Sequence, residues 1–294
     1  MTEGRLRGKG LRSPQPAVEA EHTPIARGSL TTHLEFGNFG AGIGELEVDG
    51  FEARISNNSK RQDALAVSTD KKVFVVCDGL GGTAGSIPET VSAWSRAVAE
   101  VTAQIGSIQT FVEEKNFVAF ISRIKRAMEA RGTNFALPEK IRGRGLGVMT
   151  TLSAVERLGK NVFHILAIGD SPIYVIDKAT GKILKQYGED AIRGETSAPI
   201  ENAVGMDQVG SVRTLRPETQ NFLINESIVV HPGQLIVIGS DFFSDHTFFG
   251  RNLKEYIGLS PEQFHAATTL PDTVKVDDAS LIVIDPEKLP SFEK

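Results

Sequence analysis

Short apolar runs with the two-residue alternation typical of β-strands surround a single pair of helical patterns, and this order constrains the fold most. Strands are predicted over residues 46–55, 64–68 and 73–77, ahead of the helices. Later strands are predicted over residues 148–155, 162–168, 173–176, 227–230, 234–238 and 279–284. Strands and helices do not alternate regularly, as they would in a doubly wound parallel sheet. The sequence therefore predicts an α+β fold of antiparallel sheets faced by helices.

Two amphipathic patterns predict the helices. Ser86 and Glu89 have the spacing of a capping box, and Pro88 suits the first turn of a helix. Apolar residues then recur at intervals of three and four, at Val91, Trp94, Val98, Val101 and Ile105. A second apolar stripe ends before Gly132 and consists of Phe117, Phe120, Ile121, Ile124 and Met128.

The 294 residues are enough for one large domain. Residues 1–30 mix basic residues, glycine and proline with little periodicity, which is typical of a flexible N-terminal tail. The folded domain is expected over residues 31–288, and residues 289–294 are expected to form a C-terminal tail. Within the domain, weak periodicity predicts a surface loop over residues 188–222, and residues 248–257 are expected to form a short helix.

Charge and cysteine content limit the partners of the protein. The formal net charge of −5 argues against a surface that collects nucleic acid or anionic lipid. No apolar run approaches the roughly 20 residues that cross a bilayer, and the N-terminus lacks the apolar segment of a signal peptide. The single cysteine, Cys77, fits a reducing compartment and a packing role. We therefore expect a cytoplasmic monomer without nucleic-acid or membrane partners.

Aspartates border the predicted strands at well-separated places in the chain. One aspartate at a strand end is usually a solvated turn former, so the signal lies in the repetition of the pattern. Mg²⁺ and Mn²⁺ are hard cations that require oxygen ligands, and a few carboxylates held on rigid strand ends supply them. The acids that follow this pattern are Asp63, Asp78, Asp170, Asp241 and the adjacent pair Asp277 and Asp278.

The glycine-rich stretch after Asp78 also permits a second interpretation, a cradle for a nucleotide phosphate. Gly79, Gly81 and Gly85 have the spacing of a variant dinucleotide fingerprint. That fold requires a second strand with an acidic residue soon afterwards, whereas two consecutive helical patterns follow here. No Gly-Lys-Ser or Gly-Lys-Thr completes a Walker loop. The position of Asp78 favours a cation over a phosphate.

At these acids the sequence resembles the metal-dependent protein phosphatases of the phosphatase 2C type. VVCDGLGG is similar to the family's Asp-Gly-x-Gly-Gly motif, GVMTTLSAV to its Gly-x-Thr-Thr-Leu segment, and AIGDSPIYVI to its Gly-Asp-Ser-Arg motif. IGSDFFSD resembles its Ser-Asp-Gly-Leu-x-Asp motif, and VDDASLIVI resembles its closing Asp-Asp or Asp-Asn motif. The stretches occur in family order between about residues 40 and 285.

The resemblance implies an αββα sandwich of two antiparallel β-sheets flanked by helix pairs, with a metal site at one end of the sheets. It implies two Mn²⁺ or Mg²⁺ ions, with a third, weaker one near Asp170. Asp278 is the less favoured acid of its pair. The implied ligands of the two main ions are Asp63, Asp78, the carbonyl of Gly79, Asp241 and Asp277.

Positions that grip the phosphate in the family differ here. Asn58 stands where an arginine is common, and Lys60 and Arg61 are the candidate replacements for substrate binding. Pro172 replaces the arginine that follows Gly-Asp-Ser, and Leu80 stands where some members have a histidine that acts as a general acid.

The resemblance implies a serine/threonine phosphoprotein phosphatase. A water that bridges the metal pair would attack phosphorus, and Asp63, Asp78, Asp241 and Asp277 would act through the metals. This agrees with the absence of an obvious protein nucleophile. The expected partner is a phosphorylated protein. The alternative is a catalytically weak, phosphatase-like scaffold that acts as a regulatory binding protein. Phe242 and Phe243 replace the family's Gly-Leu beside a ligand. Asn58, Phe242 and Pro172 favour this alternative, whereas the intact set of aspartates weighs against it.

Overall fold

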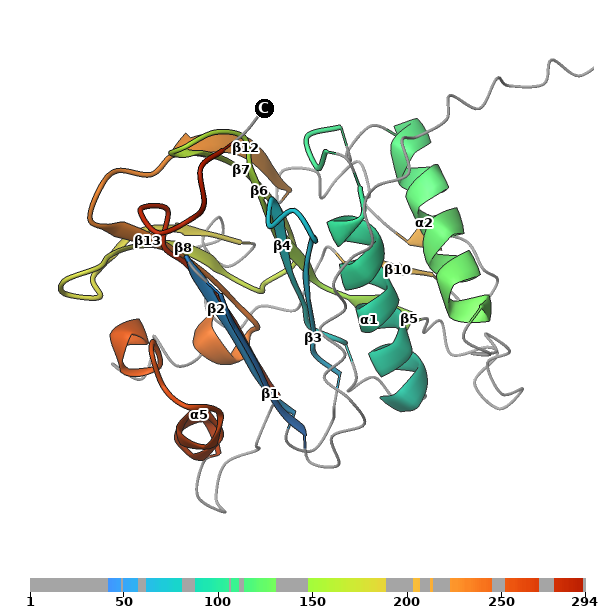
Figure 1. Ribbon diagram of the computed structural model, residues 1–294. Helices are drawn as coiled ribbons and strands as arrows, with labels where there is room; N and C mark the ends of the chain where they lie inside the picture. Colours follow the sequence, from blue (N-terminus) through green and yellow to red (C-terminus); the bar gives the residue numbers. More distant parts are fainter. Residues whose placement is uncertain are drawn as a thin grey trace, which may run out of the picture.

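Two large antiparallel sheets pack face to face in the computed structural model of the chain (Figure 1). The residues that the structure describes are 42–48, 50–57, 62–80, 88–105, 107–110, 114–130, 148–188, 203–206, 212–213, 223–244, 252–269 and 278–292. All statements below concern these residues.

The first sheet has six strands in the order β1-β2-β14-β13-β8-β9. The last strand of the chain lies beside an early one, because β14 pairs with β2 over their whole lengths. The strand bounds are β1 Gly42–Val48, β2 Phe51–Asn57, β8 Ile173–Asp177, β9 Ile183–Tyr187, β13 Gln234–Gly239 and β14 Ala279–Ile284.

The second large sheet has five strands in the order β12-β7-β6-β4-β3, and three short strands form a separate sheet in the order β11-β10-β5. The five are β3 Ala64–Val67, β4 Val73–Cys77, β6 Leu152–Arg157, β7 Val162–Ile168 and β12 Ile224–Val229. The short strands are β5 Val148–Thr150, β10 Val204–Met206 and β11 Val212–Arg213.

Helices cover the outer faces of both sheets (Figure 1). Helices α1 (Pro88–Ala103) and α2 (Glu114–Glu129) lie over the five-stranded sheet. Helix α5 (Pro261–Thr268) and the single 3₁₀ turn η3 (Leu253–Glu255) lie over the six-stranded sheet. The predicted sandwich of two antiparallel sheets faced by helices is therefore confirmed. Residues 242–244, after β13, are also helical. No described helix is long and apolar enough to cross a membrane.

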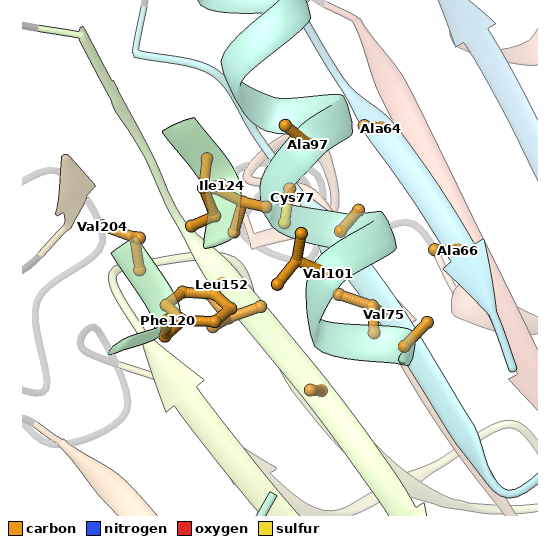
Figure 2. Close-up of a cluster of buried hydrophobic side chains, with 14 of the residues drawn as sticks. Ala64, Ala66, Val75, Cys77, Ala97, Val101, Phe120, Ile124, Leu152 and Val204 are labelled. Atoms are coloured by element: carbon orange, nitrogen blue, oxygen red, sulfur yellow. The ribbon is translucent and has the colours of Figure 1, made fainter. Parts of the chain in front are cut away.

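Three layers of buried apolar side chains hold the sandwich together. The middle layer lies between the sheets and contains Phe74 and Ile165 on one side and Ile236 and Ile282 on the other. The layer under α1 and α2 is shown in Figure 2, where side chains of both helices face strands β3, β4 and β6. Trp94 of α1 is fully buried in this layer, and its indole N–H donates to the carbonyl of Val204 at 2.9 Å. A third layer lies under α5.

Several predicted boundaries differ from the observed ones. Residues 46–55 form two strands of a hairpin, which turns at Gly50 with a φ of 91°. Residues 148–155 are divided at Thr151, where β5 ends and β6 begins. The helix expected over residues 248–257 is only the turn η3 within the described part of the chain. The surface loop expected over residues 188–222 contains the short strands β10 and β11.

Helix α5 was not predicted, although its start has a clear sequence signature. Ser260 accepts a hydrogen bond from the backbone N–H of Gln263, and the Gln263 side chain accepts one from the backbone N–H of Ser260. This is a capping box with a proline at the first helical position. For α1, the predicted capping residues Ser86 and Glu89 lie outside the residues whose side chains the structure describes, as does Gly132 after α2.

The end of the chain packs against the domain. Leu289 is buried in the middle layer, although it was assigned to the tail 289–294. The Arg157 guanidinium donates to the carbonyl of Pro290 at 2.7 Å and lies over the ring of Phe292. The packed part of the chain therefore continues to Phe292. The predicted N-terminal tail, residues 1–30, lies outside the described residues.

Candidate active site

Asp78 is held at the end of β4 by two threonines from the break between β5 and β6. The backbone N–H of Asp78 donates to Thr151 Oγ1 at 3.0 Å. Its carbonyl accepts from the Thr151 N–H at 2.8 Å and from Thr150 Oγ1 at 2.7 Å. These three hydrogen bonds fix the backbone of Asp78, so its half-buried carboxylate is presented at the edge of the sandwich.

Gly79 lies where three segments meet. It forms an isolated bridge with Thr150, and a Cβ built on it would lie 2.6 Å from Val91 Cγ1 and 2.8 Å from Gln62 Cβ. With contacts this short, a side chain at this position would require neighbouring atoms to shift. The absence of a side chain at Gly79 lets its backbone approach Gln62 and Val91 this closely.

Asp241 meets Asp78 from the other sheet. It lies two residues after the end of β13, and its backbone N–H donates to Asp78 Oδ2 at 3.3 Å. Ser244 stabilises the turn, because both its backbone N–H and its hydroxyl donate to the Asp241 carbonyl at 2.9 Å. Phe242 and Phe243 are buried in the layer under α5, so their bulk fills the core behind Asp241.

Asp63 precedes β3 and is also buried. Its Oδ2 accepts a hydrogen bond from the Ser280 hydroxyl at 2.8 Å. Asp278, at the start of β14, accepts from the backbone N–H of Gln62 at 2.6 Å, which ties this segment to the one that carries Asp63. This hydrogen bond joins the start of β14 to the segment that precedes β3.

Asp170 lies in the turn between β7 and β8, after Gly169 with a φ of 98°. The following residue, Ser171, connects this turn to the threonines that hold Asp78. Its hydroxyl lies 2.7 Å from Thr151 Oγ1, and its carbonyl accepts from the Ser153 hydroxyl at 2.6 Å. A continuous set of hydrogen bonds therefore joins the turns of Asp78 and Asp170.

The electrostatics of Asp78 show that the four acids share one region. Burial raises the pKa of the Asp78 carboxyl well above its usual range. Negative charge from three other predicted site residues raises this pKa further, in the order Asp241, Asp63 and Asp170. We call these four residues the acid cluster. Gathering four carboxylates at one place is unfavourable unless protons or cations compensate their charge.

The donor set fits a hard divalent cation. The acid cluster and the Gly79 carbonyl offer oxygen atoms alone, which suits Mg²⁺ or Mn²⁺. As the side chains are placed, no group of three His, Cys, Asp or Glu residues in the described part of the chain forms a ready metal site. The predicted ligand Asp277 lies outside the described residues, as do the candidate substrate-binding residues Lys60 and Arg61.

Cys77 does not take part in this chemistry. Its side chain is fully buried under α1 (Figure 2), and burial followed by the negative charge of Asp63 raises the pKa of its thiol well above the usual value. A thiol with a raised pKa and no access to solvent is a poor nucleophile. The packing role predicted for Cys77 agrees with this position.

The sequence did not single out every residue that holds the acid cluster. The carboxylates follow from their repeated position at strand ends, but their partners do not. Thr150 and Thr151 lie in the stretch that resembles the Gly-x-Thr-Thr-Leu segment, which was the only available sign of their role. Gln62 and Ser280 carry no such sign, because their contacts join segments that are far apart in sequence.

Comparisons with known proteins give neighbours of similar fold. No family model and no curated protein matches the chain. Among solved structures, PppA, a regulatory component of T6SS in Pseudomonas aeruginosa, is 18% identical, with 82% of this chain and 99% of that chain covered and a TM-score of 0.49. The catalytic domain of the serine/threonine protein phosphatase PstP with two manganese ions is 18% identical, with 80% and 96% covered and a TM-score of 0.46.

A third neighbour is the PPM Ser-Thr phosphatase MsPP from Mycobacterium smegmatis. It is 18% identical, with 83% of this chain and 97% of that chain covered and a TM-score of 0.43. These neighbours are serine/threonine phosphatases or a regulatory component, and the likeness concerns the fold alone. At such identities and TM-scores, the function proposed below rests on the residues of this chain.

Proposed function

We propose that the protein is a Mn²⁺- or Mg²⁺-dependent serine/threonine phosphoprotein phosphatase that acts in the cytoplasm as a monomer. The observation that carries the proposal is the convergence of Asp63, Asp170 and Asp241 on Asp78 at one end of the sandwich. Carboxylates from four separate strand ends supply the oxygen-rich, negatively charged environment that a pair of divalent ions requires.

Asp63, Asp78, Asp241 and the Gly79 carbonyl would hold the two main ions together with Asp277, and Asp170 would contribute to a third. Such ions lower the pKa of water and neutralise negative charge on phosphoryl oxygens. The chain supplies rigidity. Thr150 and Thr151 fix the backbone of Asp78, and Ser280 orients the Asp63 carboxylate.

Hydrolysis of p-nitrophenyl phosphate and of a phosphothreonine peptide tests the proposal. We expect turnover that requires Mn²⁺ or Mg²⁺ and falls at least a hundredfold in Asp78→Asn and in Asp241→Asn, because each change removes a negatively charged oxygen ligand. Asp70→Asn is the matched control, since Asp70 is exposed in the β3–β4 turn at the opposite end of β4. Its turnover should equal that of the wild type.

Turnover that persists in EDTA, or that survives both substitutions, would contradict the proposal. The melting temperature with and without Mn²⁺ gives a readout that does not depend on activity, because an ion that binds only the folded state stabilises it. A rise in melting temperature without turnover would favour the regulatory scaffold instead.

A further inference from the structure

The turn that carries Asp170 connects the two large sheets. It follows β7 of the five-stranded sheet and leads into β8 of the six-stranded sheet. On one side of the turn, the Ser171 hydroxyl lies 2.7 Å from Thr151 Oγ1, just before β6. On the other side, the Pro172 carbonyl accepts a hydrogen bond from the backbone N–H of Gly239, the last residue of β13, at 3.0 Å. The residues directly after Asp170 therefore join the two sheets.

Thr151 extends this connection to Asp78. Its single side-chain oxygen, Oγ1, contacts the Ser171 hydroxyl and also accepts the hydrogen bond that the backbone N–H of Asp78 donates at 3.0 Å. Asp241 completes the connection from the six-stranded sheet, because its backbone N–H donates to Asp78 Oδ2 at 3.3 Å. Asp78 is thus linked to the turn of Asp170 through two hydroxyl groups, those of Thr151 and Ser171.

This hydroxyl pair is closed off from water. Thr151 and Ser171 are both fully buried, and so is Ser153, whose hydroxyl donates to the Ser171 carbonyl at 2.6 Å. A buried polar group that loses its partner has no water to replace it. Removal of the Ser171 hydroxyl should therefore also disturb Thr151 and the backbone group that Thr151 binds.

The hydroxyl pair holds the acids by groups other than their carboxylates. Thr151 Oγ1 binds the backbone N–H of Asp78, and Thr150 Oγ1 donates to the Asp78 carbonyl. The hydrogen bonds of Ser171 involve its own hydroxyl and carbonyl. None of these four bonds occupies an oxygen of the Asp78 or Asp170 carboxylate. The hydroxyl groups are also neutral, so they add no charge that would compete with a cation for the acids.

We propose that Thr151 and Ser171 are positioning residues that couple the place of Asp78 to the place of Asp170. Their shared hydrogen bond holds the two acids in the arrangement that binds divalent ions. The inference rests on the proposed function, which assigns both acids to ion binding. It deepens that function, because the two hydroxyl groups act through the acids and are not ligands themselves.

Amide hydrogen exchange of the metal-free full chain tests the coupling, with the N–H of Asp78 followed by nuclear magnetic resonance. We expect Ser171→Ala to speed the exchange of this N–H at least tenfold, although Ser171 is connected to it only through Thr151. The N–H groups of Val75 and Val76, inside β4, should keep their wild-type rates. An unchanged rate at Asp78, or equal acceleration along β4, would overturn the proposal.

Isothermal titration calorimetry with Mn²⁺ alone tests the consequence for ion binding. Ser171→Ala and Thr151→Val should each weaken Mn²⁺ binding about tenfold or more, as is usual when a residue that orients a metal ligand is lost. Thr151→Ser retains the hydroxyl and should bind nearly as well as the wild type. Thr102→Val is the matched control, because Thr102 is also fully buried and its hydroxyl donates to the Val98 carbonyl of α1 at 2.7 Å. It should bind Mn²⁺ like the wild type.

The outcomes separate this inference from the proposed function. If the wild type binds Mn²⁺ and both Ser171→Ala and Thr151→Val bind it equally well, the inference is overturned and the proposed function stands. Equal weakening by Thr102→Val would attribute the effect to a general loss of stability and would also overturn the inference. A folded wild type that binds neither Mn²⁺ nor Mg²⁺ would contradict the proposed function, and the role of the hydroxyl pair in ion binding with it. Melting curves establish that each variant is folded.

Discussion

Gly79, the residue after Asp78 of the acid cluster, has little free space around its Cα. Gly79 lies two residues after the end of β4, where it forms a bridge with Thr150. It approaches Val91 of α1 and Gln62, the residue before Asp63. A methyl group here has no free space, since the nearest atoms belong to a packed helix and to a backbone segment. The positions of Asp63 and Asp78 thus depend on a residue without a side chain.

We expect Gly79→Ala to lower the free energy of unfolding by about 1–3 kcal/mol, because overpacking forces neighbouring atoms apart. Phosphatase turnover should fall as well, since the segments of Asp63 and Asp78 would move. Gly159→Ala is the control, because its Cβ would lie 3.7 Å from Val162, an ordinary contact. Urea unfolding measures both variants. Equal stability of the two would show that Gly79 is not crowded.

The sequence predicted the residues of the acid cluster better than the contacts that hold them. Asp63, Asp78, Asp170 and Asp241 were predicted from their place beside apolar runs. The other three lie close enough to Asp78 for their charge to raise the pKa of its carboxyl. The contact between Ser280 and Asp63 spans 217 positions of sequence, so no local pattern could reveal it.

The boundaries of strands were predicted well where a polar residue or a glycine directly follows the apolar run. The bounds of β4, β7 and β14 match the predicted ranges, because polar residues or glycines follow each apolar run. The prediction of one strand over residues 46–55 was wrong, because the chain turns at Gly50. The alternation changes phase at this turn, from Leu46 and Val48 to Phe51, Ala53 and Ile55. Helix α5 was missed because it is short and fully buries only Phe264 and Thr268.

The capping box of α5 gives a prediction at this scale. We expect Ser260→Ala to lower the free energy of unfolding by about 0.5–2 kcal/mol, because the N–H of Gln263 loses its acceptor. Ser260→Asn should restore most of the stability, since asparagine is also a preferred N-cap residue. Chemical denaturation followed by far-ultraviolet circular dichroism measures both. A Ser260→Asn variant as weak as Ser260→Ala would indicate that the cap is unimportant.

For the whole molecule, the class of fold was predictable and the order of strands was not. Separated strand runs around one helix pair indicated antiparallel sheets faced by helices. The pairing of β14 with β2 joins the two ends of the domain, and it is dictated by packing in three dimensions. The same closure brings Asp278 to Gln62 at one end of the sheet and Asp285 to Gly50 at the other.

The segment after β14 completes this closure, which the tail assigned to residues 289–294 did not anticipate. Leu289 enters the layer between the sheets, and a Cβ on Gly50 would lie 2.5 Å from its backbone nitrogen. We expect Leu289→Ala to lower the free energy of unfolding by about 2–5 kcal/mol, as for other buried leucines. Phe292→Ala should cost about 1 kcal/mol or less, because the ring is partly exposed and lies beside the cations of Lys72 and Arg157.

Urea denaturation measures the free energy of unfolding of both variants and of a chain that ends at Lys288. The comparison shows whether residues 289–294 stabilise the fold by packing or form a tail without effect on stability. If Leu289 closes the inter-sheet layer, the shortened chain loses at least as much stability as Leu289→Ala, because it also loses the hydrogen bond from Arg157 to the Pro290 carbonyl. A shortened chain as stable as the full one would instead make residues 289–294 a tail and leave the sheets closed by β14 alone. The stability of the sandwich thus depends on Leu289, which lies far along the chain from the strands it packs against. The acid cluster likewise depends on contacts between distant segments, such as that of Ser280 with Asp63.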